Sequence, residues 1–72
     1  MANNNTAMAA KKTYVFTVTY TDGGAYPFSM GNQKVEALTR KGAEAILRER
    51  FYDVTITSVE LVATLDKNGD VL

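Results

Sequence analysis

An alternating run from Thr13 to Tyr20 is the feature that most constrains how this chain folds. Its larger side chains stand at every second position: Tyr14, Phe16, Val18 and Tyr20. The positions between them carry valine or threonine: Val15, Thr17 and Thr19. Alternate side chains of a strand share one face, and β-branched and aromatic residues favour strands. The run therefore predicts a strand, and apolar residues on both of its faces indicate a central place in a sheet.

A turn signal follows this strand directly. Asp22-Gly23-Gly24 connects two β-rich runs, and glycine adopts positive φ without steric strain from a Cβ atom. The return strand is expected to begin at Ala25 and Tyr26 and to continue its alternation through Phe28 and Met30. Pro27 has no N–H to donate to a neighbouring strand, so this second strand is predicted to lie at a sheet edge or to contain a bulge.

The segment from Gly31 to Leu38 supports two interpretations. In the first, Gly31 forms a bulge, 33–37 extends the strand, and Thr39 caps a helix that runs to about Tyr52. In the second, Ser29 or Asn32 caps a longer helix that contains Gly42 at a free-energy cost of about 1 kcal/mol. We favour the shorter helix. Its apolar stripe would be Ala43, Ile46, Leu47 and Phe51, with Leu38 packed on Ala43 beside the cap.

The C-terminal part of the chain predicts one long strand, from Val54 to Leu65. Its alternation changes phase once, because Val54 and Ile56 share one face whereas Val59, Leu61, Ala63 and Leu65 share the other. This change indicates a bulge near Thr57 and Ser58. A tight turn is expected at 66–69, followed by a short stub at 70–72.

These elements define an α+β fold of the ββαβ type. A right-handed crossover places the last strand beside the first and parallel to the second, which gives a small antiparallel or mixed sheet of order 2-1-3 with the helix on one face. The domain spans 13–72, and 1–12 is expected to be a mobile tail. One helix covers one face, so the other face, with residues such as Thr17, Thr19, Thr55 and Thr57, is open to water or to a partner.

Composition excludes the commonest reactive chemistry. The chain has neither Cys nor His, so it lacks thiolate and imidazole metal ligands and the usual general base for a serine or threonine nucleophile. The string Asp66-Lys67-Asn68-Gly69-Asp70 resembles the start of a calcium loop. Its glycine stands at the fourth position, where a calcium loop needs it at the sixth, and no glutamate follows at the twelfth. We expect no enzymatic activity, no metal and no cofactor.

Two groups of residues are candidates for binding a partner. Tyr26, Phe28 and Met30 form an apolar cluster on the expected edge strand, and aromatic residues and Met are enriched in protein interfaces; alternatively, they cap the core. Lys34, Lys41 and Arg48 are spaced by seven, so a long helix would align them as a basic ridge for nucleic acid, with Tyr14, Phe16 or Tyr20 stacking on bases. The alternative is a solvated helix face above an aromatic core.

Charge and hydropathy give further expectations about location. Eight Lys and Arg balance eight Asp and Glu, so no net field steers the protein to nucleic acid or to anionic lipid. No run approaches the ~20 apolar residues of a membrane span, and the first ten residues lack the pattern of a secretory signal. A cytoplasmic protein without membrane contact is predicted.

Over the whole run from Lys12 to Leu61, through Asp22-Gly23-Gly24 and Gly42-Ala43-Glu44-Ala45-Ile46, the chain resembles small phage or mobile-element proteins with a ββαβ plan, among them the anti-CRISPR inhibitors. The resemblance implies a protein that binds and blocks a host factor, within the bacterial cytoplasm. Our leading hypothesis is thus a non-catalytic protein-binding module that inhibits a bacterial defence (CRISPR-Cas) complex. The alternatives are a small nucleic-acid-binding protein that uses the basic helix face and a self-associating structural protein, such as a homodimer.

Overall fold

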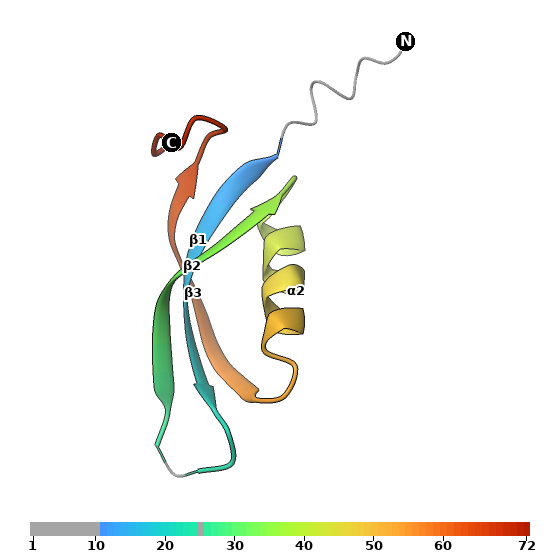
Figure 1. Ribbon diagram of the computed structural model, residues 1–72, viewed down its shortest axis with the longest axis vertical. Helices are drawn as coiled ribbons and strands as arrows, with labels where there is room; N and C mark the ends of the chain where they lie inside the picture. Colours follow the sequence, from blue (N-terminus) through green and yellow to red (C-terminus); the bar gives the residue numbers. More distant parts are fainter. Residues whose placement is uncertain (1–10, 25) are drawn as a thin grey trace.

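The computed structural model describes residues 11–24 and 26–72 and contains three strands and one helix among them (Figure 1). In chain order the elements are β1 (Lys12–Thr21), β2 (Phe28–Ala37), α2 (Arg40–Arg50) and β3 (Thr55–Leu65). The predicted tail lies outside the described residues except for Lys11 and Lys12, and Lys12 belongs to β1. Ala25, where the return strand was expected to begin, also lies outside them. Tyr26 precedes the strand, which begins at Phe28.

The sheet has the predicted strand order, β2-β1-β3, so the α+β fold with a central first strand is confirmed. β1 pairs antiparallel with both neighbours. β2 and β3 therefore run parallel to each other on opposite sides of β1, as the crossover argument required.

β2 extends to Ala37 through a bulge, which confirms the shorter-helix interpretation. Phe16 pairs with Gln33 and Val18 pairs with Met30, so two residues of β2, Gly31 and Asn32, stand opposite Thr17 alone. Asn32 has a φ of 54°, a left-handed conformation that Asn tolerates better than most residues. The bulge bends β2 between its first three residues and the half that lies beside α2.

β3 contains two bulges, of which the sequence predicted one. Tyr20 pairs with Ile56 and Thr19 with Ser58, so Thr57 is the extra residue, as expected. A second bulge lies at Val62, between the pairs Phe16 with Leu61 and Val15 with Ala63. It reverses the alternation again. The prediction that Ala63 and Leu65 share a face with Val59 and Leu61 is therefore wrong, because paired residues share a face and these two pair with Val15 and Thr13.

α2 begins where Thr39 caps it. The Thr39 Oγ1 atom accepts a hydrogen bond from the Gly42 N–H at 3.0 Å. The helix ends at Arg50, slightly earlier than expected. Of the predicted stripe, Ala43 and Leu47 are buried, whereas Ile46 is 39% exposed. Leu38 is 54% exposed, which leaves its predicted packing on Ala43 unsupported.

The core lies between α2 and one face of the sheet. Its largest fully buried side chains are Phe16, Leu47, Val18 and Val35. Tyr14, Ala37 and Ala43 complete the cluster. Figure 1 shows α2 alongside the middle of the sheet and ending short of the β1–β2 turn, so the sheet extends past the helix on the side of that turn.

Candidate interaction surfaces

The helix face of the sheet continues beyond α2 as an apolar patch, which we define as Tyr20, Phe28, Met30 and Phe51. Phe28 and Met30 stand opposite Tyr20 and Val18, so they lie on the face that carries the core. The Tyr20 ring lies 5.6 Å from the Phe28 ring and 5.5 Å from the Phe51 ring, centroid to centroid. The patch is thus continuous with the core and extends it toward the β1–β2 turn.

Much of the apolar patch remains in contact with water. Phe28 is 48% exposed and Met30 is 43% exposed, whereas Tyr20 and Phe51 are half-buried. The reason is the position of α2, which begins after Ala37 and ends at Arg50 before it could cover the first residues of β2. The predicted alternative, in which Phe28 and Met30 cap the core, applies only to the part of each side chain that is buried.

Tyr26, the third member of the predicted apolar cluster, is 80% exposed and lies before β2 rather than within it. Its ring is not paired with Tyr20, Phe28 or Phe51 among the described residues. Sequence reasoning instead missed Tyr20 and Phe51, which it assigned to the core or to the helix stripe. The stacking of Tyr20 on Phe28 follows from the hairpin register, in which these two residues form the pair nearest the turn.

The basic ridge does not form. Lys34 lies on a strand, opposite Val15, on the sheet face that points away from the helix. Lys41 and Arg48 are both exposed on α2, about two turns apart. The spacing by seven aligns three side chains only within one continuous helix, and the helix begins after Lys34. The structure therefore separates Lys34 from the other two residues.

The aromatic platform expected for nucleic acid is also absent from the open face. Phe16 is fully buried and Tyr14 is 7% exposed, both beneath α2, and Tyr20 belongs to the apolar patch. The open face carries hydroxyl groups near the β1–β2 turn, among them Thr17, Thr19 and Thr55 as predicted. Such a face is well solvated by itself and requires no partner to cover it.

The open face differs along its length. The Thr19 Oγ1 atom lies 3.2 Å from the Ser29 Oγ atom. Thr57 sits at its bulge, where its Oγ1 donates to the Thr19 carbonyl oxygen at 3.2 Å. At the other end Val15 is only 7% exposed, although α2, the helix of the described residues, lies on the opposite face. The open face thus carries hydroxyl groups near the β1–β2 turn and a buried apolar side chain, Val15, toward its other end.

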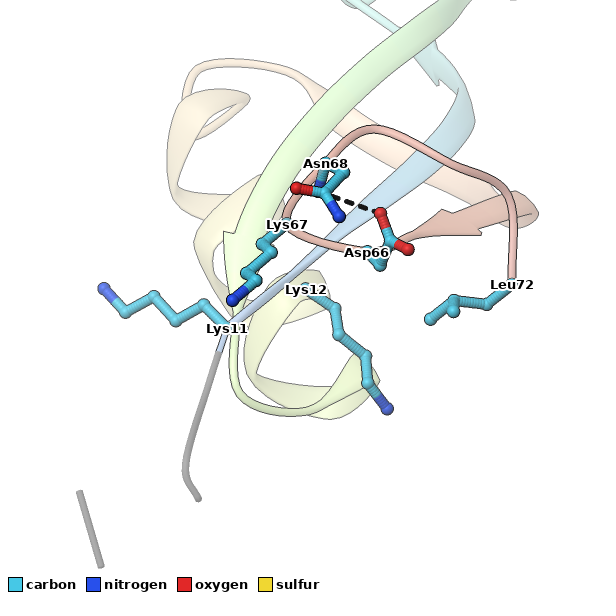
Figure 2. Close-up of a pocket in the computed structure, with 6 residues that line it drawn as sticks. All are labelled: Lys11, Lys12, Asp66, Lys67, Asn68 and Leu72. Carbon is cyan, nitrogen blue, oxygen red and sulfur yellow. Dashed lines mark hydrogen bonds between the residues drawn. The ribbon is translucent and has the colours of Figure 1, made fainter. Parts of the chain in front are cut away.

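A pocket of about 280 Å³ lies between the start of β1 and the C-terminal turn, and Figure 2 shows its lining residues. Lys11, Lys12 and Lys67 contribute to it, but the ammonium groups of Lys11 and Lys12 point away from each other. The Asp66 Oδ1 atom accepts hydrogen bonds from the N–H groups of Asn68 and Asp70, at 2.9 and 3.0 Å. These bonds form the predicted tight turn, and they commit this carboxylate oxygen to the backbone.

Two backbone carbonyl oxygens of β2, an edge strand, accept hydrogen bonds from side chains. Arg50 Nη1 donates to the Lys34 carbonyl oxygen at 2.8 Å, and Gln33 Nε2 donates to the Gly31 carbonyl oxygen at 3.2 Å. A strand that approached this edge would have to displace both side chains. The arrangement resembles the ways in which proteins protect sheet edges from unwanted pairing, and sequence reasoning gave no signal for it.

Comparisons with protein-family models, with curated proteins and with solved structures found no match to this chain. Within the described residues, no group of three or more acidic side chains is placed to hold a metal ion. No helix in that part of the chain is long and apolar enough to cross a membrane. The apolar patch is the strongest candidate site that the geometry defines.

Proposed function

We propose that this chain is a non-catalytic protein-binding module and that the apolar patch is its contact surface. The observation that carries the proposal is the exposure of Phe28 and Met30 beside an already packed core. Large apolar side chains that adjoin one another at a surface are characteristic of interaction sites, and aromatic residues and Met are preferred there. A partner that covered both side chains would complete the layer that α2 leaves unfinished.

The partner class follows from the resemblance rather than from the patch. Small phage ββαβ proteins that bind host factors support a component of a bacterial defence complex as the target, with the cytoplasm of the host as the site of action. The nucleic-acid alternative is weaker than the sequence suggested, because Lys34 is separated from Lys41 and Arg48 and the core aromatics are covered. Neither a basic ridge nor a stacking surface supports it.

The test compares variants that differ in where they remove apolar surface. The wild-type chain, a Phe28→Ser/Met30→Ser variant and a Tyr52→Ser variant would each be used to capture proteins from bacterial lysate. Tyr52 is 85% exposed and is not part of the apolar patch, so its replacement is a matched control. Each recovered protein would then be purified and its affinity for all three chains measured.

We expect one partner to bind wild type and Tyr52→Ser equally, and to bind the double variant at least about tenfold more weakly. That ratio corresponds to 1.4 kcal/mol, which is modest for two interface residues. Equal binding to all three chains would contradict the patch. Retention of nucleic acid without any protein would contradict the proposed function, and concentration-dependent sedimentation of wild type alone would support self-association instead.

A further inference from the structure

The two edges of the sheet differ in how their backbone groups are used. Successive residues of an antiparallel strand direct their N–H and C=O groups alternately toward the paired strand and away from it. On β2, the carbonyl oxygens of Gly31 and Lys34 accept hydrogen bonds from side chains. On β3, no comparable side chain meets the outward groups among the described residues.

Three hydrogen bonds identify which residues of β3 have outward backbone groups. Thr57 Oγ1 donates to the Thr19 carbonyl oxygen, so this carbonyl points toward β3. Ser58 pairs with Thr19, so the backbone N–H and C=O groups of Ser58 point back toward β1. By alternation, Val59 and Leu61 direct their N–H and C=O groups away from the sheet. Beyond the Val62 bulge, Leu72 N–H donates to the Thr64 carbonyl at 2.8 Å from outside the sheet, and Asp66 N–H donates to the Asp70 carbonyl at 2.9 Å.

The chain itself shows that this edge accepts an added strand. Val71 forms an antiparallel bridge with Leu65, and the bridge lies on the outer side of β3. This added segment pairs only with the end of β3. In Figure 1 the half of β3 that carries the C-terminal segment lies on the side of the sheet away from α2. The next outward backbone groups along the strand belong to Leu61 and Val59.

We propose that the stretch Ser58–Leu61, which we call the β3 edge, binds an extended segment of a partner protein as an additional antiparallel strand. Val59 and Leu61 supply the backbone hydrogen bonds. Glu60 lies between them, with its side chain on the open face opposite Thr17. A Lys or Arg of the partner opposite Glu60 provides the charge complement, as cross-strand pairs of opposite charge do. This surface is separate from the apolar patch, so the inference goes beyond the proposed function.

The charge of Glu60 also argues against a second copy of this chain as the occupant. Two β3 edges related by a two-fold axis can pair both outward residues only if Val59 faces Leu61 of the other copy. Glu60 then faces Glu60 of the other copy directly, and like charges in that position are destabilising. The other registers bring the bulges at Thr57 or Val62 into the pairing, where they interrupt the hydrogen bonds.

The test uses an end-blocked peptide, acetyl-Thr-Val-Lys-Val-Thr-amide, and the full chain labelled with ¹⁵N. When the peptide binds in the proposed register, the two valines of the peptide pair with Val59 and Leu61 and the lysine of the peptide faces Glu60. At saturation we expect amide hydrogen exchange at Val59 and Leu61 to slow by at least about tenfold. The same peptide N-methylated at both valines is the matched control, and it should give no protection.

The charge pair is tested by a cycle in which the peptide lysine is replaced by norleucine and Glu60 by glutamine. Norleucine should weaken binding to wild type by about two- to fivefold, the range of a cross-strand charge pair. It should have no effect on the Glu60→Gln variant. Equal effects of norleucine on both chains would refute the role of Glu60.

Three other outcomes would overturn the proposal. The peptide could leave Val59 and Leu61 unprotected at millimolar concentration, or the N-methylated peptide could protect them equally. Protection that rose with protein concentration in the absence of peptide would show that a second copy occupies the edge. None of these results depends on Phe28 or Met30, so failure here is distinguishable from failure of the proposed function.

Discussion

At the scale of single residues, neighbours on α2 have different energetic roles. Leu47 is fully buried and Ile46 is 39% exposed, although the sequence placed both in one apolar stripe. Leu47→Ala should lower the free energy of unfolding by about 2–5 kcal/mol, because it removes buried methyl groups and leaves a cavity. In a chain this short that loss is a large part of the total stability.

Urea unfolding followed by circular dichroism would measure this loss. Ile46→Ala is the matched control, since it removes similar apolar surface from the adjacent position and should cost about 1 kcal/mol or less. Equal losses for the two variants would mean that the helix is rotated so that Ile46 is as deeply buried as Leu47.

At the scale of elements, the start of α2 links a glycine to its cap. A Cβ atom on Gly42 would lie 3.2 Å from Thr39 Oγ1, which is the oxygen that caps the helix. Gly→Ala in a helix normally adds up to about 1 kcal/mol of stability. We therefore expect Gly42→Ala to be nearly neutral in the wild type, because the new methyl group crowds the capping oxygen.

A double-mutant cycle with Thr39→Ala tests this link. Removing the cap should itself cost about 1 kcal/mol. It should also restore the stabilising effect of Gly42→Ala, because the crowded oxygen is gone. An identical effect of Gly42→Ala in both backgrounds, measured by urea unfolding, would show that Thr39 and Gly42 act independently.

At the scale of the whole molecule, the protection of the β2 edge bears on the assembly state. Arg50→Met combined with Gln33→Thr should free the carbonyls of Lys34 and Gly31 for pairing with another chain. We expect this variant to form larger species with rising concentration in sedimentation velocity. Arg48→Met removes the same charge from an exposed site on the helix and should leave the sedimentation of the protein unchanged. If both variants behaved alike, net charge rather than edge protection would control association.

The candidate site was predictable only in part. Phe28 and Met30 could be identified because alternation continues past Pro27, and their exposure depends on where α2 ends. Lys34 was grouped with Lys41 and Arg48 because a spacing of seven suits a helix, and the strand extension to Ala37 removed that basis. The bulge at Val62 gave no signal, because Val62, Ala63 and Leu65 have side chains that suit either face of a sheet.

The sequence by itself determined the local elements of this protein: the alternating β1, the glycine-containing turn, the Thr39 cap and the phase change at Thr57. Each depends on interactions between residues that are close in the chain, so residue type and spacing are sufficient to predict them. Only the tertiary structure decided which apolar residues remain exposed and which edge groups remain unpaired. These properties depend on the placement of α2 and on the pairing of strands distant in sequence. They bring the Arg50 side chain to the Lys34 carbonyl and leave the backbone N–H and C=O groups of Val59 and Leu61 pointing away from the sheet.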